Sequence, residues 1–194
     1  AARSILLDRH LGLAEEGDDR LSVVFVGEGG AQNGRLVETL NSAAKEGLPL
    51  LVLVIDNGRA INTFTPDVAA NNEVWKIGAH FGVPGLKVDG QALGQVLSAG
   101  RAVVDYVRIE SKPAILQVHT YRFQGHSPAD PEHERGRKAE KKWARAECDP
   151  ISIFEEKHGG PLEEAKARAK ATVKQAVDFA KGSPPPPAAL SSPS

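Results

Sequence analysis

LSVVFV (residues 21–26), GEGG (27–30), a helical stretch over 34–46 and LLVLVI (50–55) decide the fold of this 194-residue chain. The two apolar runs are short and rich in β-branched residues on both faces, which is typical of strands buried within a parallel sheet. Between them, apolar residues recur at helical spacing. A strand, a glycine-rich turn, a helix and a second strand predict a βαβ unit with parallel strands and a right-handed crossover.

The rest of the chain continues this alternation. We expect the following further elements: the end of a helix at 4–13, a polar loop at 56–72, a helix from Asn72 to about Phe81, a short strand at 86–88, a helix at about 93–107, a buried strand at 114–118, a long loop at 120–135, helices at about 137–147, from Asp149 onward and at 161–180. The predicted fold class is α/β, an open and mostly parallel sheet with flanking helices. We expect one domain over 1–182 and an extended Pro/Ser-rich tail over 183–194.

Composition narrows the class of protein. The chain has 24 basic and 25 acidic residues, a net charge of −1, so it is not expected to bind nucleic acid through its overall charge. Its apolar runs are too short to span a membrane. The single cysteine, Cys148, excludes an internal disulfide framework and favours a reducing compartment. Because Met is absent even at position 1, we expect a processed or truncated product.

Ligands of such sheets bind at the carboxyl ends of the strands, which directs attention to the loop at 27–31. The small residues Gly27, Gly29 and Gly30 would let backbone N–H groups approach a phosphate. Glu28 would repel a phosphate unless a cation lay between them, so the loop suggests a Mg²⁺–phosphate site. The pattern fits neither a P-loop nor a dinucleotide fingerprint, which counts against another kind of nucleotide-binding protein. A tight turn with an exposed Glu is the alternative.

The second loop, Asp56-Asn57-Gly58-Arg59, follows the neighbouring strand. Mg²⁺ takes carboxylate, amide and carbonyl oxygens. Glu28 and Asn57 end two strands joined by one helix, so they can converge on one ion, and the backbone carbonyl of Arg59 would add a third ligand. An ordinary Asp-Asn-Gly turn is the alternative.

From Gly27 to Asn57 the chain resembles the thiamin-diphosphate motif, which begins Gly-Asp-Gly and ends Asn-Asn about 30 residues later. Within it, the stretch from Gly34 to Pro49 is similar to alpha subunits of 2-oxo acid dehydrogenases. This resemblance implies that Glu28, Asn57 and the Arg59 carbonyl hold Mg²⁺, while Gly27, Gly29 and Gly30 meet the diphosphate.

A third loop, TYRFQGHSPADP (120–131), resembles the corresponding loop of pyruvate dehydrogenase alpha subunits. The resemblance implies that His126 lines the mouth of the active site and assists acyl transfer to lipoamide. An imidazole suits this role because it exchanges protons near neutral pH. Ser127 matches a position that is phosphorylated in mitochondrial relatives. The sequences ADPEHER (129–135) and FGVPGLKVDG (81–90) are most similar to those of cyanobacterial and plastid members of the family.

The resemblance covers the C-terminal half of such a subunit, over about residues 1–180. It implies thiamin-diphosphate-dependent oxidative decarboxylation of pyruvate, a beta subunit in an α2β2 assembly, a lipoyl-bearing acyltransferase core as partner, and a plastid location, with the mitochondrial matrix or bacterial cytoplasm as alternatives. Glu28 also matches branched-chain 2-oxo acid dehydrogenases. Asp56 and Arg59 depart from the family, which leaves a non-catalytic structural or regulatory paralogue as a further alternative.

Overall fold

The computed structural model describes residues 1–127, 138–159 and 162–185. The chain forms two units, Ala1–Phe154 and Glu155–Ser194. The first contains the sheet and every described residue of the candidate site. The second contains the last long helix, α7 (Leu162–Gly182). The division into a domain at 1–182 and a tail at 183–194 stays a prediction.

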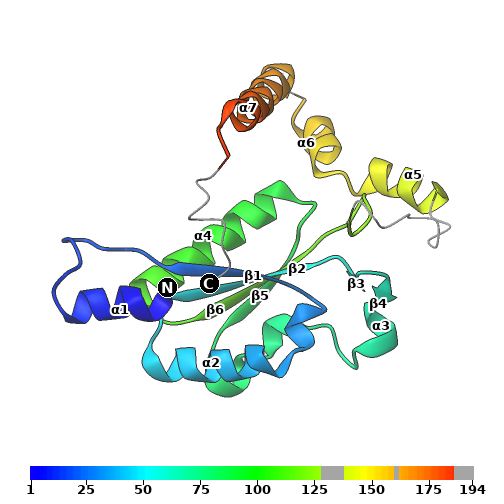
Figure 1. Ribbon diagram of the computed structural model, residues 1–194. Coiled ribbons are helices and arrows are strands. Elements are labelled where there is room, and N and C mark those ends of the chain that lie inside the picture. Colours follow the sequence, from blue (N-terminus) through cyan, green and yellow to red (C-terminus); the bar gives the residue numbers. More distant parts are fainter. Residues whose placement is uncertain (128–137, 160–161, 186–194) are drawn as a thin grey trace. The chain divides into compact units, whose positions relative to one another are not determined.

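A four-stranded parallel sheet forms the centre of the first unit (Figure 1). Its strands, in spatial order, are β1 (Ser22–Gly27), β2 (Leu50–Asp56), β6 (Ala114–His119) and β5 (Gly85–Asp89). The α/β class with a mostly parallel sheet and flanking helices is therefore confirmed. The βαβ unit is confirmed in its elements and in its parallel pairing, with Val24 opposite Val52.

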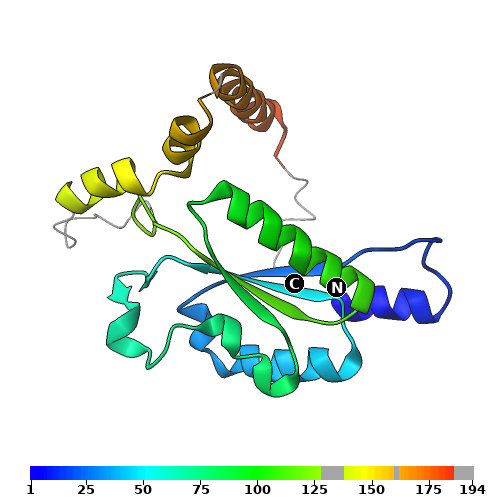
Figure 2. The same ribbon diagram turned by 180° about the vertical axis from the view of Figure 1, so that it is seen from behind.

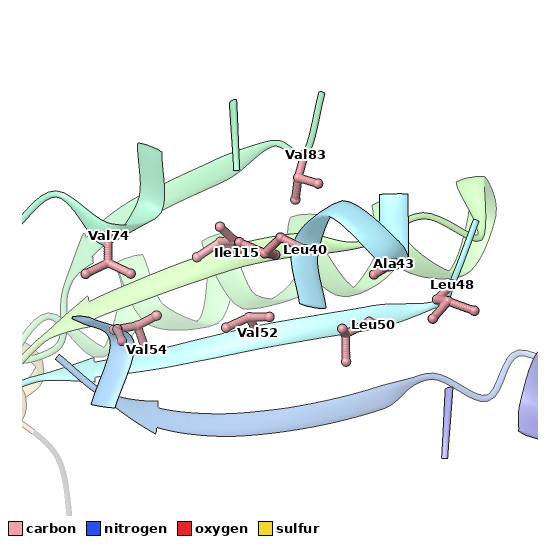
Figure 3. Close-up of a cluster of buried hydrophobic side chains, with 10 residues drawn as sticks. Leu40, Ala43, Leu48, Leu50, Val52, Val54, Val74, Val83 and Ile115 are labelled. Atoms are coloured by element: carbon pink, nitrogen blue, oxygen red, sulfur yellow. The ribbon is translucent and has the colours of Figure 1, made fainter. Parts of the chain in front are cut away.

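Helices cover both faces of the sheet, as Figures 1 and 2 show, with α2 (Gly34–Glu46) on one and α4 (Leu93–Glu110) on the other. Under α2, the side chains of Leu40, Val52 and Ile115 are fully buried and meet in one apolar cluster (Figure 3). Under α4, Val103 and Val107 pack on the opposite face. Apolar residues at helical spacing thus meet strands that are apolar on both faces, which holds the three layers together.

The ends of α2 follow from local chemistry. The side chain of Asn33 caps its start by accepting a hydrogen bond from the Arg35 backbone N–H, at 3.0 Å. Gly47 ends it with φ of 63°, a left-handed conformation that glycine adopts without strain. The chain can therefore turn directly into β2.

The remaining described elements are shorter or lie outside the sheet. They are α1 (Ala2–His10), η1 (Gly30–Gln32), β3 (Arg59–Ala60), β4 (Thr63–Phe64), α3 (Thr65–Val68), η2 (Val74–Lys76), η3 (Ala79–Phe81), α5 (Lys138–Glu147) and α6 (Pro150–His158). The region predicted as a polar loop at 56–72 thus contains a small hairpin and one helical turn.

Two expectations from the sequence are wrong. The helix from Asn72 to Phe81 is instead two separate 3₁₀ turns, because the Asn72 side chain donates a hydrogen bond to Asp56 and does not cap a helix. The strand expected at 21–26 is not buried on both faces. Phe25 is 69% exposed, because β1 pairs only with β2 among the described residues and α4 packs mainly on the other three strands.

Candidate metal centre at the carboxyl ends of the strands

Glu28 and Asn57 lie beside each other at one edge of the sheet. Gly27, at the end of β1, is paired with Ile55 in β2, so the residues that follow both strands emerge together. The Asn57 backbone N–H donates a hydrogen bond to Oε2 of Glu28 over 3.3 Å. Only 1% of Glu28 is accessible to solvent. The alternative of a tight turn with an exposed Glu is therefore wrong.

Two oxygens at the ends of β1 and β2 are buried and have no hydrogen-bond partner among the described residues. They are Oε1 of Glu28 and Oδ1 of Asn57. Burying an unpaired polar atom costs free energy, and doing so with a carboxylate costs more, unless another group compensates. Both atoms are hard oxygen acceptors of the kind that Mg²⁺ prefers, so the donor set fits a magnesium ion.

The described residues contain no group of three or more His, Cys, Asp or Glu side chains that could hold a metal ion by themselves. A carboxylate and an amide are thus the side-chain ligands that this place offers. Mg²⁺ takes six oxygens, and it commonly completes them with backbone carbonyls, water and substrate phosphates. A cation here would accordingly be held jointly by the chain and by a phosphorylated ligand.

Arg59 begins the β3–β4 hairpin, in which it is paired with Phe64. Its guanidinium lies 5.1 Å from the centre of the Phe64 ring, in a cation–π contact. The side chain is therefore engaged with the hairpin, and what Arg59 has to offer a cation is its backbone carbonyl, as the sequence indicated. Whether Arg59 binds metal or cofactor stays a prediction.

The loop at 27–31, called the glycine loop below, packs directly against this hairpin. A Cβ atom added to Gly29 would lie 2.4 Å from Cβ of Ala60, so only glycine permits the approach. A Cβ on Gly30 would lie 3.2 Å from Val26, whereas Gly27 faces open space. The 3₁₀ turn η1 follows the loop and comes before α2 in the chain.

Asp56 is the buried centre of a hydrogen-bond network. Its Oδ1 accepts from the Gly58 backbone N–H at 3.1 Å. Its Oδ2 accepts from Nδ2 of Asn72 at 2.9 Å and from Nε2 of Gln117 at 2.8 Å. Nδ1 of His119 lies 3.7 Å from the same oxygen. The carboxylate therefore connects β2 and β6 to the segment that follows the hairpin.

Sequence reasoning missed this network. Gln117 is fully buried in β6, where it also donates to the Asn72 carbonyl at 2.8 Å and accepts from the Trp75 backbone N–H at 3.0 Å. A polar residue within the apolar run AILQV (114–118) was the available signal, because buried polar groups are nearly always hydrogen-bonded.

His126 lies on the loop after β6 and is exposed. Its Nδ1 is 3.5 Å from Nη1 of Arg122, and Nη2 of Arg122 donates to the Ile61 carbonyl at the tip of the β3–β4 hairpin, at 2.5 Å. The loop is thus connected to the hairpin that carries Arg59. Ser127 is also exposed, whereas the end of the TYRFQGHSPADP motif, from Pro128, lies outside the described residues.

Comparison with known proteins places the chain in a family. The model of the family described as "Dehydrogenase E1 component" matches residues 2–189. The chain belongs to the dehydrogenase E1 family. Within that family, the glycine loop, the Asp56–Arg59 loop and the loop with His126 all fall inside the matched region.

Relatives of this dehydrogenase E1 chain include alpha subunits of the pyruvate dehydrogenase E1 component. The chain is 31% identical to the one from Rickettsia felis over 88% of its own length and 54% of that protein. It is 34% identical to subunit alpha-3, chloroplastic, from Arabidopsis thaliana, over 87% of its own length and 40% of that protein. It is 32% identical to the subunit from Rhizobium meliloti, over 88% of its own length and 51% of that protein. The chain thus spans about half the length of the curated relatives it matches.

None of the helices that the structure describes is both long enough and apolar enough to cross a membrane.

Proposed function

We propose that this chain is the thiamin-diphosphate- and Mg²⁺-binding part of a pyruvate dehydrogenase alpha subunit. The observation that carries the proposal is the pair of buried, unpartnered oxygens on Glu28 and Asn57, held together across the ends of β1 and β2. The relatives, which are named pyruvate dehydrogenase E1 component subunit alpha, support the substrate.

In this proposal Glu28 and Asn57 supply side-chain oxygens to Mg²⁺, and the Arg59 carbonyl supplies a third. The backbone at Gly27, Gly29 and Gly30 receives the diphosphate. The close packing of Gly29 on Ala60 holds the two loops at one separation, so that the metal ligands and the diphosphate-binding backbone are positioned together. Thiamin diphosphate, when bound, supplies the carbanion stabilisation that decarboxylation of a 2-oxo acid requires.

The proposed partners are a beta subunit, in an α2β2 assembly, and a lipoyl-bearing acyltransferase core. We propose the plastid stroma as the location, which the chloroplastic relatives from Arabidopsis thaliana and Oryza sativa support. Bacterial relatives have similar identities, so the bacterial cytoplasm is the alternative, together with the mitochondrial matrix. The complete gene and its source organism would distinguish these three locations.

The test is a titration of thiamin diphosphate with Mg²⁺ against the purified complex that contains the beta subunit. We expect saturable, Mg²⁺-dependent binding that Glu28→Gln weakens by about 10-fold or more, since the variant exchanges a charged ligand oxygen for an amide. Glu16→Gln, which changes an exposed Glu on the loop before β1, is the matched control and should bind like the wild type. Absence of saturable binding to the wild type would exclude the enzyme and favour the non-catalytic paralogue.

The role of His126 makes a separate prediction. In His126→Gln we expect decarboxylation measured with an artificial electron acceptor to continue, while acyl transfer to lipoamide falls by about 10²-fold, the lower range for loss of acid–base assistance. Cofactor affinity should stay unchanged. Equal losses in both assays would assign His126 to an earlier step.

The substrate has one specific alternative. Glu28 matches the residue of branched-chain 2-oxo acid dehydrogenases, so the same complex should be assayed with pyruvate and with 3-methyl-2-oxobutanoate. We expect the higher kcat/KM with pyruvate. A preference for the branched substrate would assign the chain to the branched-chain enzymes.

A further inference from the structure

Asp56 differs from the other buried carboxylate of the candidate metal centre in one respect. Oε1 of Glu28 has no partner in the described part of the chain, whereas both oxygens of Asp56 already accept hydrogen bonds. Only 1% of Asp56 is exposed, so solvent does not compete for these bonds. Its carboxylate therefore does not resemble a vacant ligand, although it immediately precedes Asn57.

We propose that Asp56 is a positioning residue that holds the metal-binding loop in the geometry that Mg²⁺ requires. This inference rests on the proposed function, because it concerns the same metal site. Through Oδ1, Asp56 fixes the Gly58 N–H and so constrains the turn that contains Asn57. Through Oδ2, it is fixed in turn by Asn72 and Gln117.

Gln117 determines which groups of the network donate hydrogen bonds and which accept them. Its Oε1 accepts from the Trp75 N–H and its Nε2 donates to the Asn72 carbonyl, so the amide cannot turn round without losing both bonds. Nε2 of Gln117 must therefore find an acceptor at position 56. The Gly58 N–H also needs one, on the other oxygen. A carboxylate satisfies both donors at once.

An asparagine at position 56 would satisfy only one of them. Its NH₂ group would face either the Gly58 N–H or the Gln117 NH₂, and one buried donor would lose its acceptor. The network of this chain therefore fits Asp at position 56 better than the first Asn of the pair with which the family motif ends. Residues that orient metal ligands typically change metal affinity by about 10–100-fold when they are replaced.

The experiment compares two cations on the complex that contains the beta subunit. Dissociation constants for Mg²⁺ and for Ca²⁺ are measured calorimetrically with thiamin diphosphate present. Mg²⁺ demands near-octahedral geometry at about 2.0–2.1 Å, whereas Ca²⁺ tolerates longer and less regular coordination. In Asp56→Asn we therefore expect Mg²⁺ affinity to fall by about 10-fold or more and Ca²⁺ affinity to fall less.

The matched control is Asp89→Asn. Asp89 ends β5, is exposed, and accepts from the Gln91 N–H at 2.9 Å, so it makes the same kind of turn without a buried network. It should leave both affinities unchanged. Equal weakening of both cations by Asp56→Asn, or no weakening, would overturn the positioning role, because a merely destabilised protein loses both alike.

Asn72→Ala covers the case in which Asp56→Asn does not fold, judged by its metal-free thermal transition. This variant removes one donor to Oδ2 and keeps the carboxylate, and a smaller shift in the same direction is expected. If the ratio of the Mg²⁺ affinity to the Ca²⁺ affinity were the same in Asn72→Ala as in the wild type, the inference would be overturned. A wild type that binds neither cation would overturn the proposed function itself and, with it, this inference.

Discussion

At the residue scale, three site residues were open to prediction and one role was not. Glu28, Asn57 and Arg59 are noticeable in the sequence because they are polar residues that follow apolar strands, at the edge where parallel sheets bind ligands. In the sequence, Asp56 is noticeable only as a departure from the family motif. Its partners, Asn72 and Gln117, are 16 and 61 residues away in the chain. The polar residue in the apolar run 114–118 indicates that Gln117 is hydrogen-bonded, but it does not indicate to which residue.

Asp18 makes a prediction at this scale for pH dependence. Arg20 donates to its Oδ1 at 2.8 Å and Arg9 donates to its Oδ2 at 3.1 Å, and these contacts, Arg20 first, hold the pKa of Asp18 well below its ordinary value of 3.8. A lowered folded-state pKa stabilises the protein above the ordinary value, and this stabilisation is lost as the pH falls below it.

We therefore expect Asp18→Asn to lower the urea midpoint at pH 6, and the difference from wild type to shrink as the pH falls from 4 to 3. Unfolding curves at these pH values measure it. Asp19→Asn, which removes the same charge from an exposed neighbour, should change the midpoint less at pH 6. If the difference in urea midpoint between Asp18→Asn and the wild type grew as the pH fell, the pKa of Asp18 would not be lowered by folding.

At the element scale, prediction succeeded where the determinants are local. The helix at 34–46 has its predicted bounds because the Asn33 cap, the apolar spacing and Gly47 all lie within it or beside it. The helix predicted at 72–81 fails for the opposite reason. The Asn72 carbonyl and the Trp75 N–H form hydrogen bonds with Gln117 of β6, so this segment forms two short turns in place of a continuous helix.

The contact between the glycine loop and the β3–β4 hairpin makes a prediction at this scale. Gly29→Ala places two Cβ atoms 2.4 Å apart, whereas carbon atoms pack at about 3.5–4.0 Å, so the loops must separate by about 1 Å. We expect Mg²⁺-dependent thiamin-diphosphate affinity to fall by about 10-fold or more. Calorimetric titration of the beta-containing complex measures this.

Two further variants decide whether crowding is the cause. Adding Ala60→Gly removes the opposing Cβ and should restore most of the affinity. Gly34→Ala adds a methyl group where nothing lies within 4 Å and should leave binding unchanged. If the double variant binds no better than Gly29→Ala alone, steric crowding is not the reason for the loss.

At the scale of the whole molecule, the main departure from expectation is β1, which lies at an edge of the sheet and, in the described part of the chain, pairs only with β2. Val23, Val24 and Phe25 are consecutive and exposed, so β1 presents apolar side chains on both faces. Natural edge strands usually carry charges, prolines or bulges, and β5 has Lys87 and Asp89, but SVVFVG has neither charge nor proline. Such an edge favours association with other chains.

We expect the isolated chain to associate in a concentration-dependent way, and Phe25→Lys to reduce this association at least several-fold in light scattering. Leu11→Lys is the control, because it adds the same charge at a 61% exposed apolar residue that lies at the end of α1 and not in a strand. An equal improvement in both variants would mean that net charge, rather than the edge of β1, governs solubility.

The sequence by itself determined the α/β class, the βαβ unit and the residues that could ligate a cation, because periodicity, caps and strand-end chemistry act between near neighbours. Only the tertiary structure decided that oxygens of Glu28 and Asn57 are buried and have no hydrogen-bond partner within the described parts of the chain, that Gln117 and Asn72 donate to Asp56, and that β1 pairs with β2 alone among the described strands and exposes apolar side chains. These features depend on which distant segments meet and how closely, and burial and pairing exist only once those segments have packed together.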